Sequence, residues 1–132
     1  MVLAGSGVAI AFVRDALPQL DKEGLDLNVF YVASSELFDL LPRKEREEIF
    51  PERLSYQAMG ITDFTMPTMW RWVRSDEGCA KSLHTFRTGH YLGSGQGDRV
   101  LAEAGIDGPA QLRAVRDWAK AKLASPFAEA KR

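Results

Sequence analysis

The alternation of short strand-like runs with segments of helical spacing is the feature that most constrains how this chain folds. Strand-like runs lie at residues 1–4, 27–32, 54–59 and 82–86. Between the first two, apolar residues recur at helical intervals, at Ile10, Val13, Leu17 and Leu20. This alternation predicts an α/β fold with a mostly parallel sheet. The 132 residues suffice for one domain, which we place at 1–124, before a frayed tail at 125–132.

Residue types that begin and end helices divide the chain further. Ser34-Ser35 is placed to cap a short helix, and a charged helix over residues 43–50 follows it. Gly105 is expected to close a helix over residues 98–104, and Asp107-Gly108-Pro109 to open the last helix, with Pro109 near its first position. The predicted order of elements is therefore β-α-β-α-α-β-α-β-α-α.

The segment at residues 65–73 is the part richest in aromatic residues and methionine. Its helical spacing is carried by Met66, Met69, Trp70 and Val73, and Gly78 is expected to break the helix. Trp70 and Trp72 are two apart and cannot share one helical face, so we expect one in the core and one outward. Tryptophan and methionine are enriched at interfaces. We therefore keep two equal alternatives for this segment: core packing, or contact with another chain or domain through Met66, Met69, Trp70 and Trp72.

The turn Gly5-Ser6-Gly7 lies where a strand passes into a helix. Backbone amides at such a position attract anions, and glycines allow close approach, so the turn is a candidate anion site. It fails the dinucleotide pattern, because Ile10 stands where a third small residue is needed and no acidic residue follows the second strand. A plain tight turn is the alternative.

Charge and hydropathy exclude several classes of protein. The formal net charge of −1 argues against a nucleic-acid or anionic-membrane binder. The longest apolar run, residues 7–13, is too short to span a bilayer, and no Lys or Arg precedes it as a signal peptide requires. The single cysteine, Cys79, cannot form an internal disulfide, which favours a reducing compartment. We therefore expect a cytoplasmic protein with neither nucleic acid nor membrane as a partner.

No group of residues in the sequence amounts to a catalytic, cofactor-binding or metal site. Cys79, His84 and His90 match no zinc-binding spacing. The glycine-rich loop over residues 89–97 lacks the Gly-Lys-Ser/Thr that ends a phosphate-binding loop. His90 lies in that loop and is the histidine we expect to contact a ligand or partner domain, because loop residues often carry function.

Several motifs follow one another along nearly the whole chain. They are Val2-Leu3-Ala4-Gly5-Ser6-Gly7-Val8, Ser35-Glu36-Leu37-Phe38-Asp39, Arg46-Glu47-Glu48-Ile49-Phe50-Pro51, residues 53–60, Trp70-Arg71-Trp72-Val73, and Thr85-Phe86 before a glycine-rich loop. In this order and spacing the chain resembles the C-terminal domain of transketolases and related thiamine-diphosphate enzymes. It departs from the family at Gln57, where an acid is usual, and in the longer loop over residues 89–97.

The resemblance implies a three-layer sandwich with a five-stranded mixed sheet, four strands parallel and one antiparallel, flanked by helices. It also implies that thiamine diphosphate and a divalent ion, Mg²⁺ or Ca²⁺, bind to an N-terminal section or subunit, in a homodimer or hetero-oligomer. The intact enzyme would transfer a two-carbon ketol unit between sugar phosphates, and this chain would support its dimer packing. Two alternatives stay open: the C-terminal domain of a 2-oxoacid dehydrogenase that contacts a partner subunit, and a free-standing anion- or nucleotide-binding module using residues 5–7.

Overall fold

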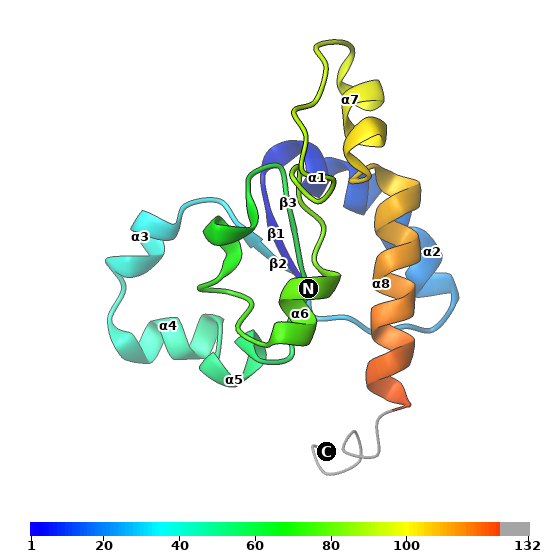
Figure 1. The fold of residues 1–132 in the computed structure, drawn as a ribbon. Coiled ribbons are helices and arrows are strands. Elements are labelled where there is room, and N and C mark those ends of the chain that lie inside the picture. The colour runs from blue at the N-terminus through cyan, green and yellow to red at the C-terminus, as the bar shows by residue number, and fades with distance from the viewer. Residues whose placement is uncertain (125–132) are drawn as a thin grey trace.

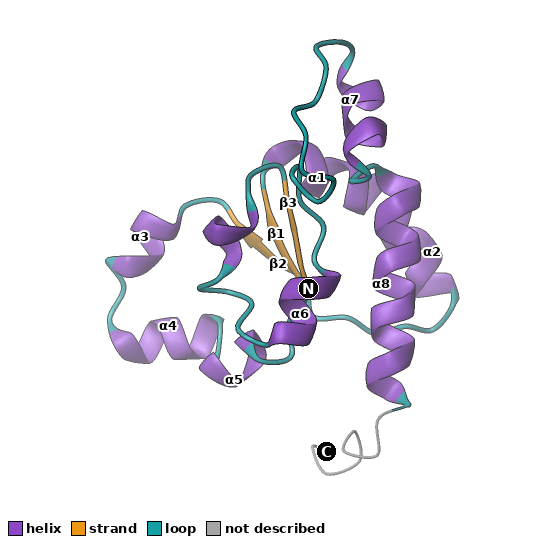
Figure 2. Cartoon of the chain, in the orientation of Figure 1, coloured by secondary structure: helices purple, strands orange, loops and turns teal. Residues whose placement is uncertain are grey.

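Three parallel strands form the centre of the fold in the computed structural model, which describes residues 1–124. They are β1 (Val2–Ala4), β2 (Phe30–Val32) and β3 (Gly60–Thr62). β1 lies in the middle, so the order across the sheet is β2-β1-β3 (Figures 1 and 2). The chain is thus an α/β protein with a small open parallel sheet. The tail expected at residues 125–132 lies outside the described residues.

Helical segments connect the strands and follow the last of them. The first connection contains α1 (Ser6–Ala11), the π-helix η1 (Phe12–Ala16) and α2 (Leu17–Lys22). The second contains α3 (Ser35–Asp39), α4 (Arg43–Ile49) and α5 (Glu52–Ser55). After β3 come the 3₁₀-helix η2 (Met66–Met69), α6 (Asp76–Lys81), α7 (Gly97–Ala104) and α8 (Gly108–Leu123).

The expected capping residues are confirmed at three helices. The Ser34 hydroxyl accepts a hydrogen bond from the amide of Leu37 at 3.1 Å and so caps α3. Gly105 follows α7 in the left-handed conformation, with φ of 68°. Asp107 caps α8, and Pro109 lies in its first turn, where a missing amide donor is harmless. Local residue chemistry therefore determines these boundaries.

The first connection buries a face different from the one its apolar spacing indicated. The fully buried residues lie four apart, at Val8, Phe12, Ala16 and Leu20. Residues four apart drift around a regular α-helix of 3.6 residues per turn, but η1 inserts a wider turn that keeps them in line. That turn directly precedes Pro18, which has no amide to donate. As a consequence, Ile10 and Val13 are 61% and 58% exposed and form an apolar pair on the outer side.

One face of the sheet is covered by the first helical connection together with α8 (Figure 1). The buried cluster on this face includes Leu3, Phe12, Leu20, Ile61, Ile106, Val115 and Trp118. The buried amide of Gln111 on α8 donates to the carbonyl of Val8 at 3.1 Å, which joins α8 to α1. At the surface, Arg116 Nε donates to Glu23 Oε2 at 2.9 Å and joins α8 to the end of α2.

The opposite face of the sheet carries a second core beneath α3–α6. Its buried residues are Val2, Phe50, Ala58, Met69, Trp72 and Val73. Trp72 packs edge-on against Phe38 and Phe50, with ring centroids 5.2 and 5.5 Å away. Since successive residues of β1 point to opposite faces, Val2 and Leu3 enter different cores. Helices therefore cover both faces of the sheet.

The third strand is displaced from the run at residues 54–59, so that prediction was wrong. Pro51 precedes the short helix α5, and the strand begins only at Gly60, after that run has ended. Gly60 is buried, and a Cβ there would lie 2.7 Å from Met69 Cε and 3.2 Å from Val73 Cγ2. Glycine therefore lets the segment over residues 69–73 pack directly on the sheet.

The run at residues 82–86 contributes a single parallel bridge, between Leu83 and Ile61, in place of a full strand. The amide of Leu83 donates to the Gly60 carbonyl at 2.9 Å, and the Leu83 carbonyl accepts from the Thr62 amide at 3.0 Å. The Ser82 hydroxyl accepts from the Gly60 amide at 2.8 Å. Among the described residues, the sheet therefore has three strands and one bridged residue.

Two local predictions around the aromatic segment were also wrong. The helix expected over residues 65–73 is only the 3₁₀-helix η2, with Pro67 in its first turn. Gly78, expected to break a helix, lies inside α6, where a Cβ would be 2.3 Å from the Ala58 carbonyl oxygen. Close packing of α6 on the segment before β3 therefore requires glycine at that position.

Candidate functional site

The candidate site lies at the carboxyl ends of β1 and β3, where the turn over residues 5–7 meets Asp63. The chain runs from β1 to β2 on one side of the sheet and then crosses to β3 on the other side of β1, so the strand order reverses between β1 and β3. In open α/β sheets, ligands bind in the crevice at this point of reversal. Gly7 and Val8 donate their amides to the two carboxylate oxygens of Asp63, each at 3.1 Å. The Asp63 amide in turn donates to the Ala4 carbonyl at 3.1 Å.

Gly5 makes this arrangement sterically feasible. Its φ is 112°, a conformation that L-residues with side chains rarely adopt. A Cβ on Gly5 would lie 2.3 Å from Asp63 Oδ2, inside contact distance. The turn is therefore shaped around the Asp63 carboxylate, and an added phosphate would have to displace that carboxylate to reach the amides of Gly7 and Val8.

Two further polar side chains near this edge, Thr62 and His84, accept hydrogen bonds from the chain itself. The Thr62 hydroxyl accepts from the Phe64 amide at 3.0 Å, and His84 Nδ1 accepts from the Phe86 amide at 3.3 Å. Burial, aided by the charge of Arg87, lowers the pKa of His84 and so favours a neutral imidazole. The histidine acts here as an acceptor that holds the loop after Leu83.

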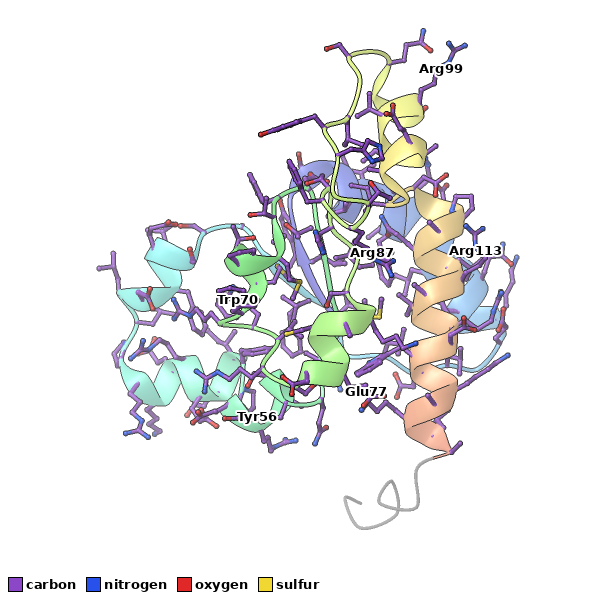
Figure 3. The ribbon with its side chains drawn as sticks, viewed as in Figure 1. Tyr56, Trp70, Glu77, Arg87, Arg99 and Arg113 are labelled. Carbon is purple, nitrogen blue, oxygen red and sulfur yellow. The ribbon has the colours of Figure 1, made fainter. Side chains whose placement is uncertain are left out.

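The predicted interface residues divide between the core and the surface. As expected for two tryptophans two residues apart, Trp72 is buried at 5% exposure while Trp70 is 60% exposed (Figure 3). Met69 is fully buried, and Met66 is half-buried against the same core. His90 is exposed on the loop before α7. Trp70 and His90 are therefore the members of the set most available to a partner.

Cys79 and the two histidines are not brought together as a metal site. The Cys79 thiol donates to the Val73 carbonyl at 3.3 Å, and burial, with a smaller effect of Asp76, raises its pKa. Within residues 1–124, no three side chains of His, Cys, Asp or Glu gather closely enough to hold an ion.

Sequence reasoning missed Asp63, the residue that completes the candidate site. The sequence does contain a signal for it, because Asp63 directly follows β3 and the glycine turn over residues 5–7 directly follows β1, at the same edge of the sheet. It was hidden by placing the third strand at residues 54–59, which puts Asp63 well beyond the strand end. The apolar pair Ile10 and Val13 was missed because a π-helical turn has no clear sequence signature.

A scan against protein-family models and a search of curated proteins each find no match to the chain. Across the described part of the chain, no helix is both long enough and apolar enough to cross a bilayer.

Proposed function

We propose that this chain is the C-terminal section, or a separate subunit, of a transketolase-like enzyme, and that it stabilises the assembly without carrying the chemistry. The proposal starts from the resemblance of its ordered motifs to that family. The observation that supports an assembly role is the closed turn at β1. Asp63 uses the amide donors that would hold a phosphate in a cofactor-binding sheet, which favours a structural turn over a nucleotide-binding module.

Exposed apolar side chains supply the surface that such a role needs. Trp70 is 60% exposed, and Ile10 and Val13 are 61% and 58% exposed. Tryptophan is among the residues that contribute most to binding energy at interfaces. In the proposed assembly these side chains are covered by a second copy of the chain or by the N-terminal section that binds thiamine diphosphate and its Mg²⁺ or Ca²⁺ ion.

The five-stranded mixed sheet of the family is part of the proposal. β2 forms one edge of the sheet, and the bridged residue Leu83 lies at the other. In the assembled enzyme we expect the run around Leu83 to serve as the fourth parallel strand. The fifth, antiparallel strand would add to the exposed edge of β2, where Tyr31 is 52% exposed.

The test begins with the chain isolated from its native source under gentle conditions. We expect it to carry a larger partner, and we expect ketol transfer between sugar phosphates, dependent on added thiamine diphosphate, from the complex but not from the chain alone. Adding Trp70→Ala to the isolated partner should restore less activity than the unmodified chain does. Tyr56→Ala is the matched control, because Tyr56 is also an exposed aromatic residue, at 53%, on a different surface (Figure 3).

Three results would contradict the proposal. Binding of thiamine diphosphate by the chain alone would place the cofactor site on this chain. A chain that purifies as a monomer with no partner would remove the assembly role. Oxidative decarboxylation of a 2-oxoacid by the complex, in place of ketol transfer, would assign it to the 2-oxoacid dehydrogenase branch.

A further inference from the structure

A small arginine-lined cavity lies on the side of the molecule formed by α3–α5 and the segment after η2. Its volume is about 190 Å³, below the 300 Å³ or so at which pockets for drug-sized ligands begin. Four arginines and two glutamates line it: Arg43, Arg46, Arg71, Arg74, Glu47 and Glu52. The residues come from three elements of the chain that are separate in sequence, so only the folded protein assembles this concentration of positive charge.

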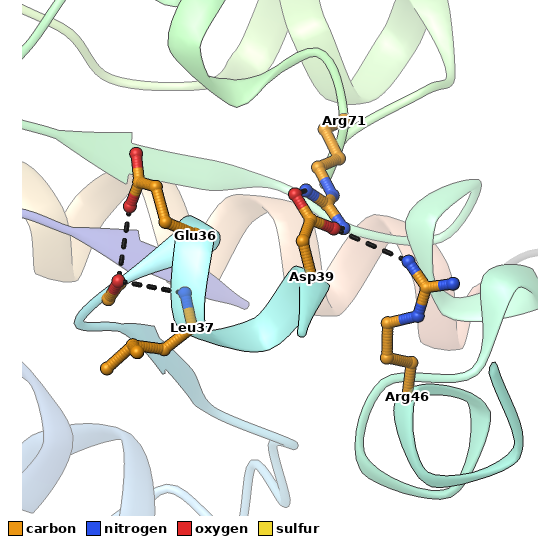
Figure 4. Close-up of polar contacts among 6 residues, drawn as sticks. Glu36, Leu37, Asp39, Arg46 and Arg71 are labelled. Carbon is orange, nitrogen blue, oxygen red and sulfur yellow. Dashed lines mark hydrogen bonds and ion pairs between the residues drawn. The ribbon is translucent and has the colours of Figure 1, made fainter. Parts of the chain in front are cut away.

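The carboxylates around the cavity are already engaged. Glu47 accepts from the Glu52 amide at 3.1 Å, and Glu52 accepts from Arg74 Nη1 at 2.5 Å. Asp39, at the edge of the cavity, forms a two-pronged ion pair with Arg71 (Figure 4). Hydrogen bonds from Arg71 hold the pKa of Asp39 below its usual range, so the carboxyl stays charged and committed to that pair.

The arginines around the cavity, in contrast, retain unused donors. Arg46 reaches Asp39 only through Nη1, at 3.4 Å. Its Nε is buried and has no hydrogen-bond partner among the described residues. Arg43, at the start of α4, makes no ion pair within residues 1–124. Arg46 Nη2 likewise makes no hydrogen bond within residues 1–124, so it and the Arg43 guanidinium keep donors that an anion in the cavity would engage.

Aromatic side chains at the cavity hold the Arg71 guanidinium in place. The Arg71 guanidinium carbon lies 4.8 Å from the centre of the Trp72 ring and 5.4 Å from that of Phe38. Trp72 is itself fixed by its edge-on contacts with Phe38 and Phe50. Charged donors over an apolar surface are less hydrated than donors in open water, so their interaction with an anion is stronger.

We propose that this cavity binds the phosphate group of a small molecule, held by the guanidinium groups of Arg46 and Arg43. Arginine suits this ligand because its planar fork of donors matches the oxygens of a phosphate. The size of the cavity limits the bound part to the phosphate group and a few further atoms. The contacts all lie within this chain, so the site does not depend on the proposed assembly.

The test is a titration of the 132-residue chain, at constant ionic strength, with inorganic phosphate and separately with glycerol phosphate. The readouts are the affinity by calorimetry and the Nε–Hε signal of Arg46 by NMR, assigned through its loss in Arg46→Lys. We expect saturable binding and a shift of that signal with at least one probe. The two arms distinguish free phosphate from a phosphate monoester as the occupant.

Three variants define the site. We expect Arg43→Gln and Arg46→Gln each to weaken phosphate binding about tenfold or more, because each removes charge-assisted donors. Arg46→Lys should also weaken it, because lysine keeps the charge but loses the planar fork. Arg113→Gln is the matched control; it makes the same change of charge on an exposed residue of α8, far from the cavity (Figure 3), and should leave the affinity unchanged. Melting curves test whether each variant is folded, and we expect Arg43, exposed at the start of α4, to tolerate substitution best.

Equal weakening in the control and the cavity variants would overturn the proposal, because it would show non-specific attraction of the anion. An Arg46 Nε–Hε signal that does not move during saturable binding would overturn it as well, because the phosphate would then sit elsewhere. So would the absence of binding by both probes.

Discussion

The packing of Gly5 against Asp63 leads to a double-mutant prediction. Asp63→Ala removes the acceptor for two amides at the start of α1. Loss of a helix cap costs about 0.5–2 kcal/mol, and loss of hydrogen bonds to a charged group costs about 1.5–3 kcal/mol. We therefore expect Asp63→Ala to lower the free energy of unfolding by about 2 kcal/mol.

Gly5→Ala should cost more, for two separate reasons. Alanine at φ of 112° carries a backbone strain of about 1–2 kcal/mol. The new Cβ would lie 2.3 Å from Asp63 Oδ2 and must push the carboxylate away from the amides, with the loss of the same 2 kcal/mol or so. The sum is about 3–4 kcal/mol. Because Gly5→Ala already abolishes the Asp63 contacts, adding Asp63→Ala to it should cost almost nothing further.

The assay is urea unfolding of the four proteins of the cycle, followed by tryptophan fluorescence. We expect a coupling of about 2 kcal/mol between the two substitutions, well beyond the 0.5 kcal/mol or so seen for independent sites. Gly24→Ala is the control for backbone strain, because Gly24 also has positive φ, 69°, but a Cβ there meets nothing within 4 Å. Additive costs in the cycle would refute the view that the turn is shaped around Asp63.

Three further predictions follow from packing and charge. Trp72→Ala, in the core, should lower the free energy of unfolding in urea by about 3–5 kcal/mol. Trp70→Ala, at the surface, should change it by no more than about 0.5 kcal/mol but weaken the association measured by sedimentation. The reverse pattern would contradict the assignment of the two rings. Gly78→Ala should lower the melting temperature although alanine favours helix, because the Ala58 carbonyl oxygen would lie 2.3 Å from the new Cβ. Gly97→Ala is the control: a Cβ there meets open space at the start of α7, so the melting temperature should stay the same or rise. The hydrogen bond from Arg116 on α8 lowers the pKa of Glu23 below its usual 4.5, so this ion pair stabilises the fold fully above pH 4.5 and loses its effect as the pH falls through the folded-state pKa. Glu23→Gln should therefore be less stable than the unmodified chain at neutral pH, and the two stabilities should converge in acid. A difference in stability that does not depend on pH would count against the pair.

Local chemistry was readable from the sequence wherever a residue acts on its immediate neighbours. Ser34, Gly105 and Asp107 bound their helices as expected, because a cap satisfies amides or carbonyls within four residues of itself. The alternation of strands and helices likewise indicated a parallel sheet, which the structure has. What stayed hidden were contacts between distant segments, such as Gly60 against Met69, which accompany a third strand that begins at Gly60, beyond the run at residues 54–59.

The same distinction explains why the candidate site could be predicted only by half. The glycine turn over residues 5–7 is visible in the sequence as a place where amides converge, but its partner, Asp63, is 56 residues away from Gly7. Without Asp63, the turn indicates an anion site open to a ligand. With Asp63, the anion bound to its amides is the carboxylate of the chain itself. Donors left without an acceptor occur instead at Arg46, in the charged helix predicted over residues 43–50, where Glu45, Glu47 and Glu48 alternate with the basic residues. The balance of charge along a helix is thus a poor guide to binding, because folding pairs some of those charges and leaves others unpaired.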